Sequence, residues 1–499
     1  MLTTMLTTMA TVLPHLLLLT FAPMVSLACP HGCQCYSDVP SVHCYYLGIT
    51  AVPSGFPPNT TLLAIRHCNI TALRRGDFSG MPLLATLYLD WNNISTIEPG
   101  TFDGLFHLQS LAIGGNRVAK LPPGLFKDNK LTDFDGSDNR IEAIPSGVFT
   151  NHSSLISLIL NGNRISMLGD DAFAGLPQLV EIQINDNLIS RLPADALKGA
   201  SKLWTLSMPR NAITKIEQGA LSDCTSLYNL DLSGNQLTTL EGTLKVQLDL
   251  TGNRITNIST LSVALESITF LDYLTLTSNP VVYLPKHAFP AFIQTDNVDL
   301  NDMKLRAVDK DAFEWMGKLQ SINMAKNRLR FIPGKLFANI SVEKVNLEGN
   351  PWYCDCQMYE FAQWMKTNNM SEKFDVVCDG PETLNGTYLS DIPLKNLTCD
   401  CVHYQAPTIN TTGSDTVVVA GHDARLVCNV TGCPEAAVIW TTPLGDAFSE
   451  DSDDPRFSVL SDGGLEIHEA KTIDAGMYIC TAINYIGSSQ EIVVLGVTG

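Results

Sequence analysis

The sequence predicts a long solenoid of short parallel strands followed by a separate all-β sandwich, and three observations lead to this expectation. Apolar residues repeat with a period of 24 residues within residues 61–350, cysteines gather on both sides of that stretch, and residues 405–496 change to short β-type segments. At 499 residues the chain is also too long for one compact core. Several domains or a repeat array are therefore expected.

The repeat follows the pattern L-x-x-L-x-L-x-x-N-x-L, in which Ile, Val, Met or Phe can replace Leu. It fits at Leu84, Leu87, Leu89, Asn92 and Ile94. Ten residues after most of the Asn positions stands Phe or Leu, which is an independent sign of the same period. The Asn positions are Asn92, Asn116, Asn139, Asn163, Asn187, Asn211, Asn235, Asn253, Asn279, Asn327 and Asn350; the later positions are Phe102, Phe126, Phe149, Phe173, Leu197, Leu221, Phe289, Phe313 and Phe337.

Physical chemistry explains why these residue types recur. In each L-x-L segment the two leucines of a short strand point to one face and the residue between them to the other. One such strand cannot bury its apolar edge alone, so neighbouring units must stack into a continuous core. The Asn side chain can bond backbone groups that would otherwise be buried without partners. The Phe is expected to fill the core from the convex side.

This pattern resembles the leucine-rich repeat family, with about 13 units in residues 61–350. The resemblance implies an α/β-type leucine-rich-repeat solenoid, a horseshoe whose concave face is a parallel β-sheet.

The period is broken around residues 238–265. Asn235 and Asn253 are 18 residues apart, the next step to Asn279 is 26, and neither of the first two is followed by Phe. The convex side should therefore be thinner here. We expect a bend or seam between two sub-arrays, and a binding notch is the alternative.

Three single positions also depart from the pattern. Met303 and Cys68 stand in Asn slots, and Cys224 stands in a slot that Leu fills elsewhere. We expect both cysteines to be buried, free and structural, because the repeats between them place them beyond disulfide distance. A reactive or mutually bridged pair is the alternative.

The four cysteines before the repeat resemble the N-terminal cap of extracellular leucine-rich repeats, here residues 29–60. Those after it, together with Trp352, resemble the C-terminal cap, here residues 351–401. The spacing alone allows three pairings in each set, and a zinc site is the competing interpretation. The resemblance implies the pairs Cys29–Cys35, Cys33–Cys44, Cys354–Cys378 and Cys356–Cys399.

Residues 405–496 resemble an immunoglobulin sandwich of the intermediate (I) set. Cys428 and Cys480 have the spacing of the inter-sheet bridge, and Trp440 has that of the residue packed on it. Tyr478 lies two residues before the second cysteine, where the tyrosine corner is expected. The resemblance further implies an ion pair between Arg456 and Asp474.

Cys401 and Cys433 are left over. Both fall at the N-terminal pole of such a sandwich, so we expect them to form a bridge that stiffens the junction with the cap. Two exposed thiols, or a bond to a second chain, are the alternatives.

The ends and the surface indicate the secretory pathway. Residues 1–28 contain an apolar stretch around Leu13 to Leu19 and end in small residues, as a cleaved signal peptide does, but they lack the Lys or Arg that usually stands at its start. No later segment is apolar enough to span a membrane, so we expect a secreted protein or the ectodomain of a surface protein. Candidate glycosylation sites are Asn59, Asn69, Asn93, Asn151, Asn257, Asn339, Asn369, Asn385, Asn396, Asn410 and Asn429.

The net charge of −19 argues against nucleic acid and anionic membrane as partners and permits a basic protein ligand. Solenoid proteins usually bind through the concave sheet. Acids beside aromatic residues on that sheet form a candidate strip for a basic partner, and a plain solvated face is the alternative. The strip comprises Tyr88, Asp90, Trp91, Trp204, Tyr228, Asp231, Asp249, Tyr273 and Asp299.

Catalytic motifs are missing from the sequence: it contains no G-x-S-x-G, P-loop or H-E-x-x-H, and we expect no enzyme activity, cofactor or metal. The combination of domains resembles the leucine-rich-repeat and immunoglobulin (LRR-Ig) family. That resemblance implies a non-catalytic extracellular recognition or adhesion protein that binds with the concave leucine-rich-repeat face and the immunoglobulin domain. The front part of a peroxidasin-like matrix enzyme and a secreted innate-immune recognition protein are the alternatives. No motif of the sequence identifies the ligand or the oligomeric state.

Overall fold

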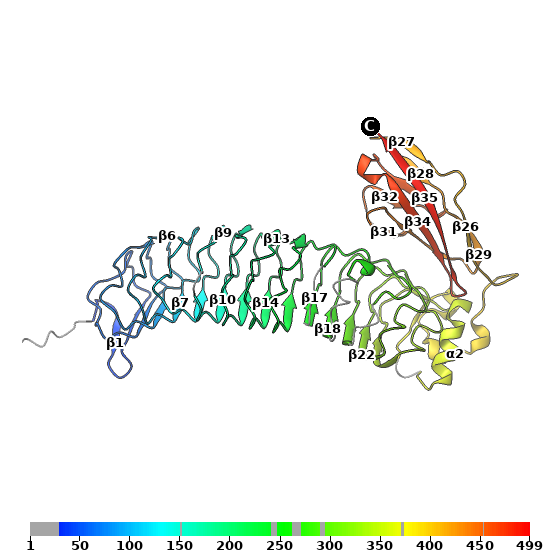
Figure 1. Ribbon diagram of the computed structural model, residues 1–499. Coiled ribbons are helices and arrows are strands. Elements are labelled where there is room, and N and C mark those ends of the chain that lie inside the picture. Colours follow the sequence, from blue (N-terminus) through cyan, green and yellow to red (C-terminus); the bar gives the residue numbers. More distant parts are fainter. Residues whose placement is uncertain are drawn as a thin grey trace, which may run out of the picture.

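The computed structural model describes residues 29–149, 152–240, 247–261, 271–289, 295–370, 374–452 and 454–499. It consists of an elongated solenoid with a β-sandwich at its C-terminal end (Figure 1). The expected signal peptide and the sequon at Asn151 lie outside the described residues. Within these ranges, no helix has the length and apolar character that a bilayer span requires.

One face of the solenoid is a 15-stranded sheet in which each coil contributes one strand. The antiparallel hairpin of β1 and β2 starts the sheet, and every later strand is parallel to its neighbours. The predicted parallel solenoid is confirmed. The strands are β1 (Gln34–Tyr36), β2 (Ser41–Tyr45), β3 (Leu62–Arg66), β5 (Thr86–Tyr88), β7 (Ser110–Ala112), β8 (Asp133–Asp135), β10 (Ser157–Ile159), β12 (Glu181–Gln183), β14 (Thr205–Ser207), β16 (Asn229–Asp231), β17 (Gln247–Asp249), β18 (Leu271–Thr275), β20 (Thr295–Asp299), β22 (Lys318–Asn323) and β23 (Ser341–Asn346).

A ladder of buried Asn side chains ties the coils together, as the repeat predicts. Asn163 is typical: its amide Nδ2 donates to the carbonyls of Gly136 and Leu160 at 2.9 and 3.1 Å. Its Oδ1 accepts from the backbone N–H of Ile141, in the preceding coil, at 3.0 Å. Each Asn therefore satisfies polar groups of two coils that would otherwise be buried without partners.

The opposite side of each coil holds a phenylalanine stack and very short strands. Phe102, Phe126, Phe149 and Phe173 are buried, and their ring centroids follow one another at 5.8–6.4 Å. A second stack begins at Phe289. The strands on this side are β4 (Ala72–Leu73), β6 (Thr96–Ile97), β9 (Ala143–Ile144), β11 (Met167–Leu168), β13 (Arg191–Leu192), β15 (Lys215–Ile216), β19 (Tyr283–Leu284) and β21 (Ala307–Val308).

The short step between Asn235 and Asn253 leaves the concave sheet unbroken. Strands β16 and β17 pair in register, and the N–H of Leu237 donates to Asn253 Oδ1 at 3.0 Å. On the convex side the 3-10 turn η1 (Ile258–Leu261) buries aliphatic residues where other coils bury Phe. Among the described residues of this region, the irregularity thus lies on the convex side. Because residues 241–246 and 262–270 lie outside the described residues, the bend itself stays a prediction.

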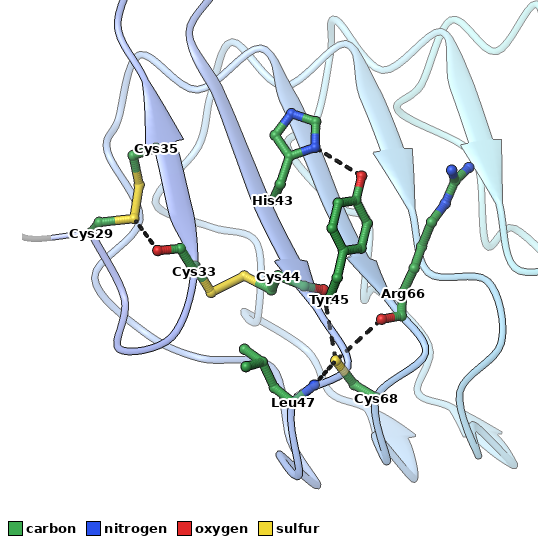
Figure 2. The surroundings of a disulfide bond; sticks show 9 residues. All are labelled: Cys29, Cys33, Cys35, His43, Cys44, Tyr45, Leu47, Arg66 and Cys68. Carbon is green, nitrogen blue, oxygen red and sulfur yellow. Dashed lines mark hydrogen bonds between the residues drawn. A yellow bond between two sulfur atoms is a disulfide. The ribbon is translucent and has the colours of Figure 1, made fainter.

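The N-terminal cap carries the disulfides Cys29–Cys35 and Cys33–Cys44 (Figure 2). Next to it, the Cys68 side chain contacts the backbone groups that an Asn side chain bonds at this position in other coils. Its thiol lies 3.4 Å from the carbonyl of Arg66 and 3.7 Å from that of Cys44, and it accepts from the N–H of Leu47 at 3.4 Å. A buried thiol can thus stand in for an amide because it is both a weak donor and a weak acceptor.

Cys224 is likewise buried and free. Burial raises the pKa of its thiol to about 12 and also raises that of Cys68. The structure therefore keeps both thiols protonated and inert at neutral pH.

In the C-terminal cap Cys354 is bonded to Cys378 and Cys356 to Cys399. Among the described residues the one group spaced to hold a metal is Asp355 with Cys356 and Cys399, and that disulfide already engages both sulfurs. The competing zinc site is therefore unsupported. The cap contains β24 (Trp352–Tyr353), η2 (Cys356–Met358), α2 (Tyr359–Thr367), β25 (Cys378–Gly380), η4 (Glu382–Leu384), η5 (Leu389–Asp391) and η6 (Leu394–Asn396).

The C-terminal sandwich has the expected immunoglobulin architecture. Cys428 and Cys480 form its buried bridge, Trp440 is fully buried, and the Tyr478 hydroxyl donates to the Asp474 carbonyl at 2.8 Å. Arg456 pairs with Asp474. The strands are β26 (Gln405–Asn410), β27 (Val417–Val419), β28 (Ala424–Leu426), β29 (Asn429–Cys433), β30 (Ala437–Thr441), β31 (Ala447–Phe448), β32 (Phe457–Val459), β33 (Leu465–Ile467), β34 (Gly476–Ile483) and β35 (Ser488–Thr498), with the turn η7 (Thr472–Asp474).

The sandwich is fastened to the solenoid at its base and along one flank. Cys401 and Cys433 form a disulfide at the junction. Farther along, Arg306 pairs with Glu450 at 3.1 Å and with Asp451, and its side chain is only 14% exposed. The hydroxyl of Thr256, within the expected seam, donates to Asp446 at 3.2 Å. The flank of the seam therefore contacts the chain's own immunoglobulin domain.

Candidate protein-binding face

The concave face is built from three residues of each coil. In the three-residue strands the central residue points inward, its two neighbours point outward, and so does the second residue after the strand. The longer strands place their residues in the same register. In the coil of β5 these concave residues are Thr86, Tyr88 and Asp90, and Leu87 between the first two is fully buried. The same alternation gives the intermediate–buried–intermediate burial of β10, β12, β14 and β16.

The concave face is acidic along most of its length. In the described coils from β5 to β22 no concave residue is Lys or Arg, and the next bases are Arg66 before this stretch and Lys344 after it. None of the concave residues is a glycosylation sequon. The acids are Asp90, Asp133, Asp135, Glu181, Asp231, Asp249 and Asp299.

Several of these acids also hold their own turns. One carboxylate oxygen of Asp231 accepts from the N–H of Ser233, and Asp249 and Asp299 accept from the residues two places after them, all at 2.9–3.0 Å. Asp at this position therefore also has a structural role, because its carboxylate caps the turn after the strand. Since the N–H bond engages only one oxygen, the other is left to add negative charge to the surface.

The central part of the predicted strip is brought together by the structure. Asp231 and Asp249 lie opposite each other in the register of β16 and β17. Tyr273 is 43% exposed, and its hydroxyl pKa is raised by burial and by the carboxylates of Asp299 and Asp249. These residues form a continuous patch, which we call the central patch.

Trp204 and Tyr228 border the central patch at the edge where the strands begin. Their rings stack with centroids 4.7 Å apart, and the Tyr228 hydroxyl bonds to Asp272 and accepts from Gln247 at 2.9 Å. The bond to Asp272 raises the pKa of Tyr228. Half of the Trp204 side chain is exposed. Aromatic rings that are already fixed in this way lose little conformational entropy when a partner binds. Such rings are frequent in protein interfaces.

Tyr88, Asp90 and Trp91 lie apart from the central patch, near the N-terminal end. Arg66 lies over the Tyr88 ring at 4.1 Å and pairs with Asp90 at 2.8 Å. Asp90 also accepts from the N–H of Gly114, and burial raises its pKa against the opposing effect of Arg66. Tyr88 and Asp90 are thus engaged within the fold. The structure divides the predicted strip into two clusters.

The N-terminal cluster also contains Tyr46 and His67, which the repeat pattern did not indicate. Tyr46 stacks on His67 at 4.9 Å, and His67 stacks on Trp91 at 6.0 Å, so that the three rings form an exposed ladder. The ladder borders a hollow of about 460 Å³ on the concave face. All three residues have positive φ and occupy the slot before the Asn position.

A sequence signal for this ladder exists in the next coil. A side chain on Gly115 would begin 2.7 Å from the Trp91 ring, so the ring requires glycine there. A large residue in this slot followed by Gly in the next coil therefore indicates a side chain lying across the edge of the sheet.

Comparisons with known proteins agree with the fold. Residues 58–118, 129–189 and 177–237 match the family described as leucine rich repeat. Residues 253–355 match the BspA type leucine rich repeat region, and residues 407–497 match the immunoglobulin I-set domain.

Among curated proteins, the chain is 26% identical over 240 residues to a zebrafish (Danio rerio) leucine-rich repeat and fibronectin type III domain-containing protein 1-like protein, covering 46% of this chain and 33% of that protein. It is 31% identical over 150 residues to human leucine-rich repeat-containing protein 4C, covering 30% and 22%. The aligned segments thus span a third or less of the length of these relatives.

A solved structure, the octameric complex of Latrophilin 3, Unc5D and FLRT2, contains a similar chain with a TM-score of 0.50 and 21% identity. The match covers 74% of this chain and all of that one. At this identity the likeness supports the fold alone.

Proposed function

We propose that this chain, which belongs to the LRR-Ig family, is an extracellular recognition and adhesion protein that grips a basic protein surface with its concave sheet. The six disulfides of the described residues fit an oxidising compartment. The relatives carry the leucine-rich repeat in their names.

The observation that carries the proposal is the absence of basic concave residues in the coils from β5 to β22, combined with exposed, fixed aromatic rings. Carboxylates on adjacent strands repel one another, and a cationic partner relieves that repulsion. Trp204 and Tyr273 add apolar area that a partner can bury. Charge complementarity would chiefly raise the association rate and select the partner, while the rings would hold it.

The test is an unbiased binding screen of the full chain against secreted and cell-surface ectodomains. The wild type is compared with the triple variant Asp231→Ala, Asp249→Ala and Tyr273→Ala. We expect the variant to lose at least tenfold in affinity for the wild-type partner, because truncating a central interface cluster costs about 2 kcal/mol or more.

A matched control carries Met167→Ala, Asp170→Ala and Asp195→Ala, which removes two acids and one exposed apolar side chain from the opposite side. The control should bind as the wild type does. Unchanged affinity of the concave variant would refute the proposal.

A further inference from the structure

The immunoglobulin domain has an exposed apolar sheet face that no described part of the chain covers. Strands β27, β35 and β34 are neighbours in one sheet. In their register Met477 lies opposite Val494 and Ile479 opposite Ile492. Val417 and Val419 extend the same face on β27. We call these six residues the apolar face: Val417, Val419, Met477, Ile479, Ile492 and Val494.

Exposure on this face is high for apolar side chains. Met477 is 62% exposed and Val494 58%, and the other members are exposed as well except Ile479, which is half-buried. The outward residues of β34 and β35 include no charged side chain, although the chain carries a net charge of −19. Contiguous exposed apolar area without charge marks an interaction site.

The apolar face continues an interface that already exists. At the opposite end of the same outward surface, Ile439 and Ile483 are buried and belong to the same apolar cluster as the repeats. The sheet thus already uses part of its outward surface for packing, and the exposed residues of the apolar face lie on the other part. The domain's sequons Asn410 and Asn429 pair across β26 and β29, in a different sheet.

We propose that the apolar face joins two copies of this chain in a symmetric dimer. Two copies of so acidic a protein repel each other, and they can approach closely only where carboxylates do not meet. A two-fold interface needs one self-complementary patch, which an uncharged apolar face supplies. The apolar face has six residues, whereas a standard interface takes about 20–30 per partner, so the dimer should be weak, with Kd in the micromolar range.

The consequence is bivalent binding. Two linked solenoids would offer two concave sheets to a partner array on a cell surface, which raises the avidity without any new contact. Dimerisation through the immunoglobulin domain leaves the concave face of each copy free. The inference stands independently of which ligand that face takes.

The test is sedimentation velocity of the full glycosylated chain from about 1 to about 100 µM. The wild type should shift from monomer to dimer over this range. The double variant Met477→Glu and Val494→Glu should stay monomeric, with Kd at least tenfold weaker. The matched control Val39→Glu and Val402→Glu adds the same charge at residues that are 63% and 92% exposed elsewhere, and it should dimerise like the wild type.

Raising the salt concentration should strengthen the wild-type dimer, because salt screens the repulsion between the acidic chains and leaves apolar burial in place. A wild type that remains monomeric at every concentration would overturn the inference. So would a double variant that retains its fold, judged by an unchanged melting temperature, and dimerises as the wild type does.

Discussion

The coils before Asn235 and the coils after Asn253 fill the convex side of the solenoid with different residues. In the coils before Asn235 a stack of Phe rings fills the convex side as far as Phe173, and Leu197 and Leu221 take the next two positions. No described residue of the immunoglobulin domain bonds to that part. In the coils after Asn253 the first stacked Phe among the described residues is Phe289, and the flank supports that domain. The concave sheet and the Asn ladder run through both parts unchanged.

The difference teaches that the convex side can vary without disturbing the concave sheet. The ladder fixes strand spacing through backbone groups, whereas the convex side needs only enough apolar volume to close the core. A binding face of constant geometry can thus be combined with a flank adapted to carry another domain.

The largest expected effect comes from breaking the first Phe stack. Phe126 is fully buried between the rings of Phe102 and Phe149, and replacing it with Ala should destabilise the first part by about 3–5 kcal/mol. Leu221→Ala, where the stack is interrupted, should cost about 2–3 kcal/mol, because less apolar volume is removed. Urea unfolding of the full chain measures both. Equal losses would contradict the dependence on the apolar volume removed.

The next largest effect is expected in the ladder of buried Asn side chains. Asn163→Ala removes a side chain that bonds four backbone groups of two coils and should cost about 2–3 kcal/mol. Cys68→Asn should cost less than about 1 kcal/mol or stabilise, because the Asn would replace weak thiol bonds with amide bonds. A strong loss of stability in Cys68→Asn would show that the two slots are not equivalent.

A smaller effect is expected at the domain contact. Arg306→Ala should cost at most about 1 kcal/mol, since its carboxylate partners are half-exposed, and it should loosen the flank contact, leaving the bond of Thr256 and the buried apolar base to hold the immunoglobulin domain. Small-angle X-ray scattering should show a larger spread of dimensions. Arg210→Ala, in the first part of the solenoid, is the control and should leave the scattering unchanged.

The smallest effect concerns an exposed ion pair of the first part. Arg210 holds the pKa of the Asp186 carboxyl below its ordinary value. A lowered pKa in the folded state means that the stabilisation is present above the ordinary Asp pKa and is lost as the pH falls through the lowered one. Because both side chains are mostly exposed, the contribution should be below about 0.5 kcal/mol. The difference in melting temperature between wild type and Asp186→Asn should therefore be small at neutral pH and vanish in acid.

Periodic features could be predicted from the sequence because each residue's environment repeats in the next coil. The inward leucines, the Asn ladder and the buried Cys68 follow from slot positions alone. The Phe stack and its interruption follow in the same way.

The remaining features depend on contacts without a period. Thr256 and Asp446 are 190 residues apart, and no pattern links them. The ladder of Tyr46, His67 and Trp91 arises because positive φ turns side chains across the sheet edge, which residue type alone does not indicate. The candidate strip appeared continuous because the sequence does not show that Arg66 already engages Tyr88 and Asp90.

The central claim is that the acidic concave sheet, and not the flank or the sandwich, receives the partner. Hydrogen–deuterium exchange of the full chain, with and without the partner identified by the ectodomain screen, tests it most directly. We expect protection in peptides that contain β14 to β20, with little change in the convex segments between these strands. Protection confined to the convex segments or to the immunoglobulin domain would contradict the account.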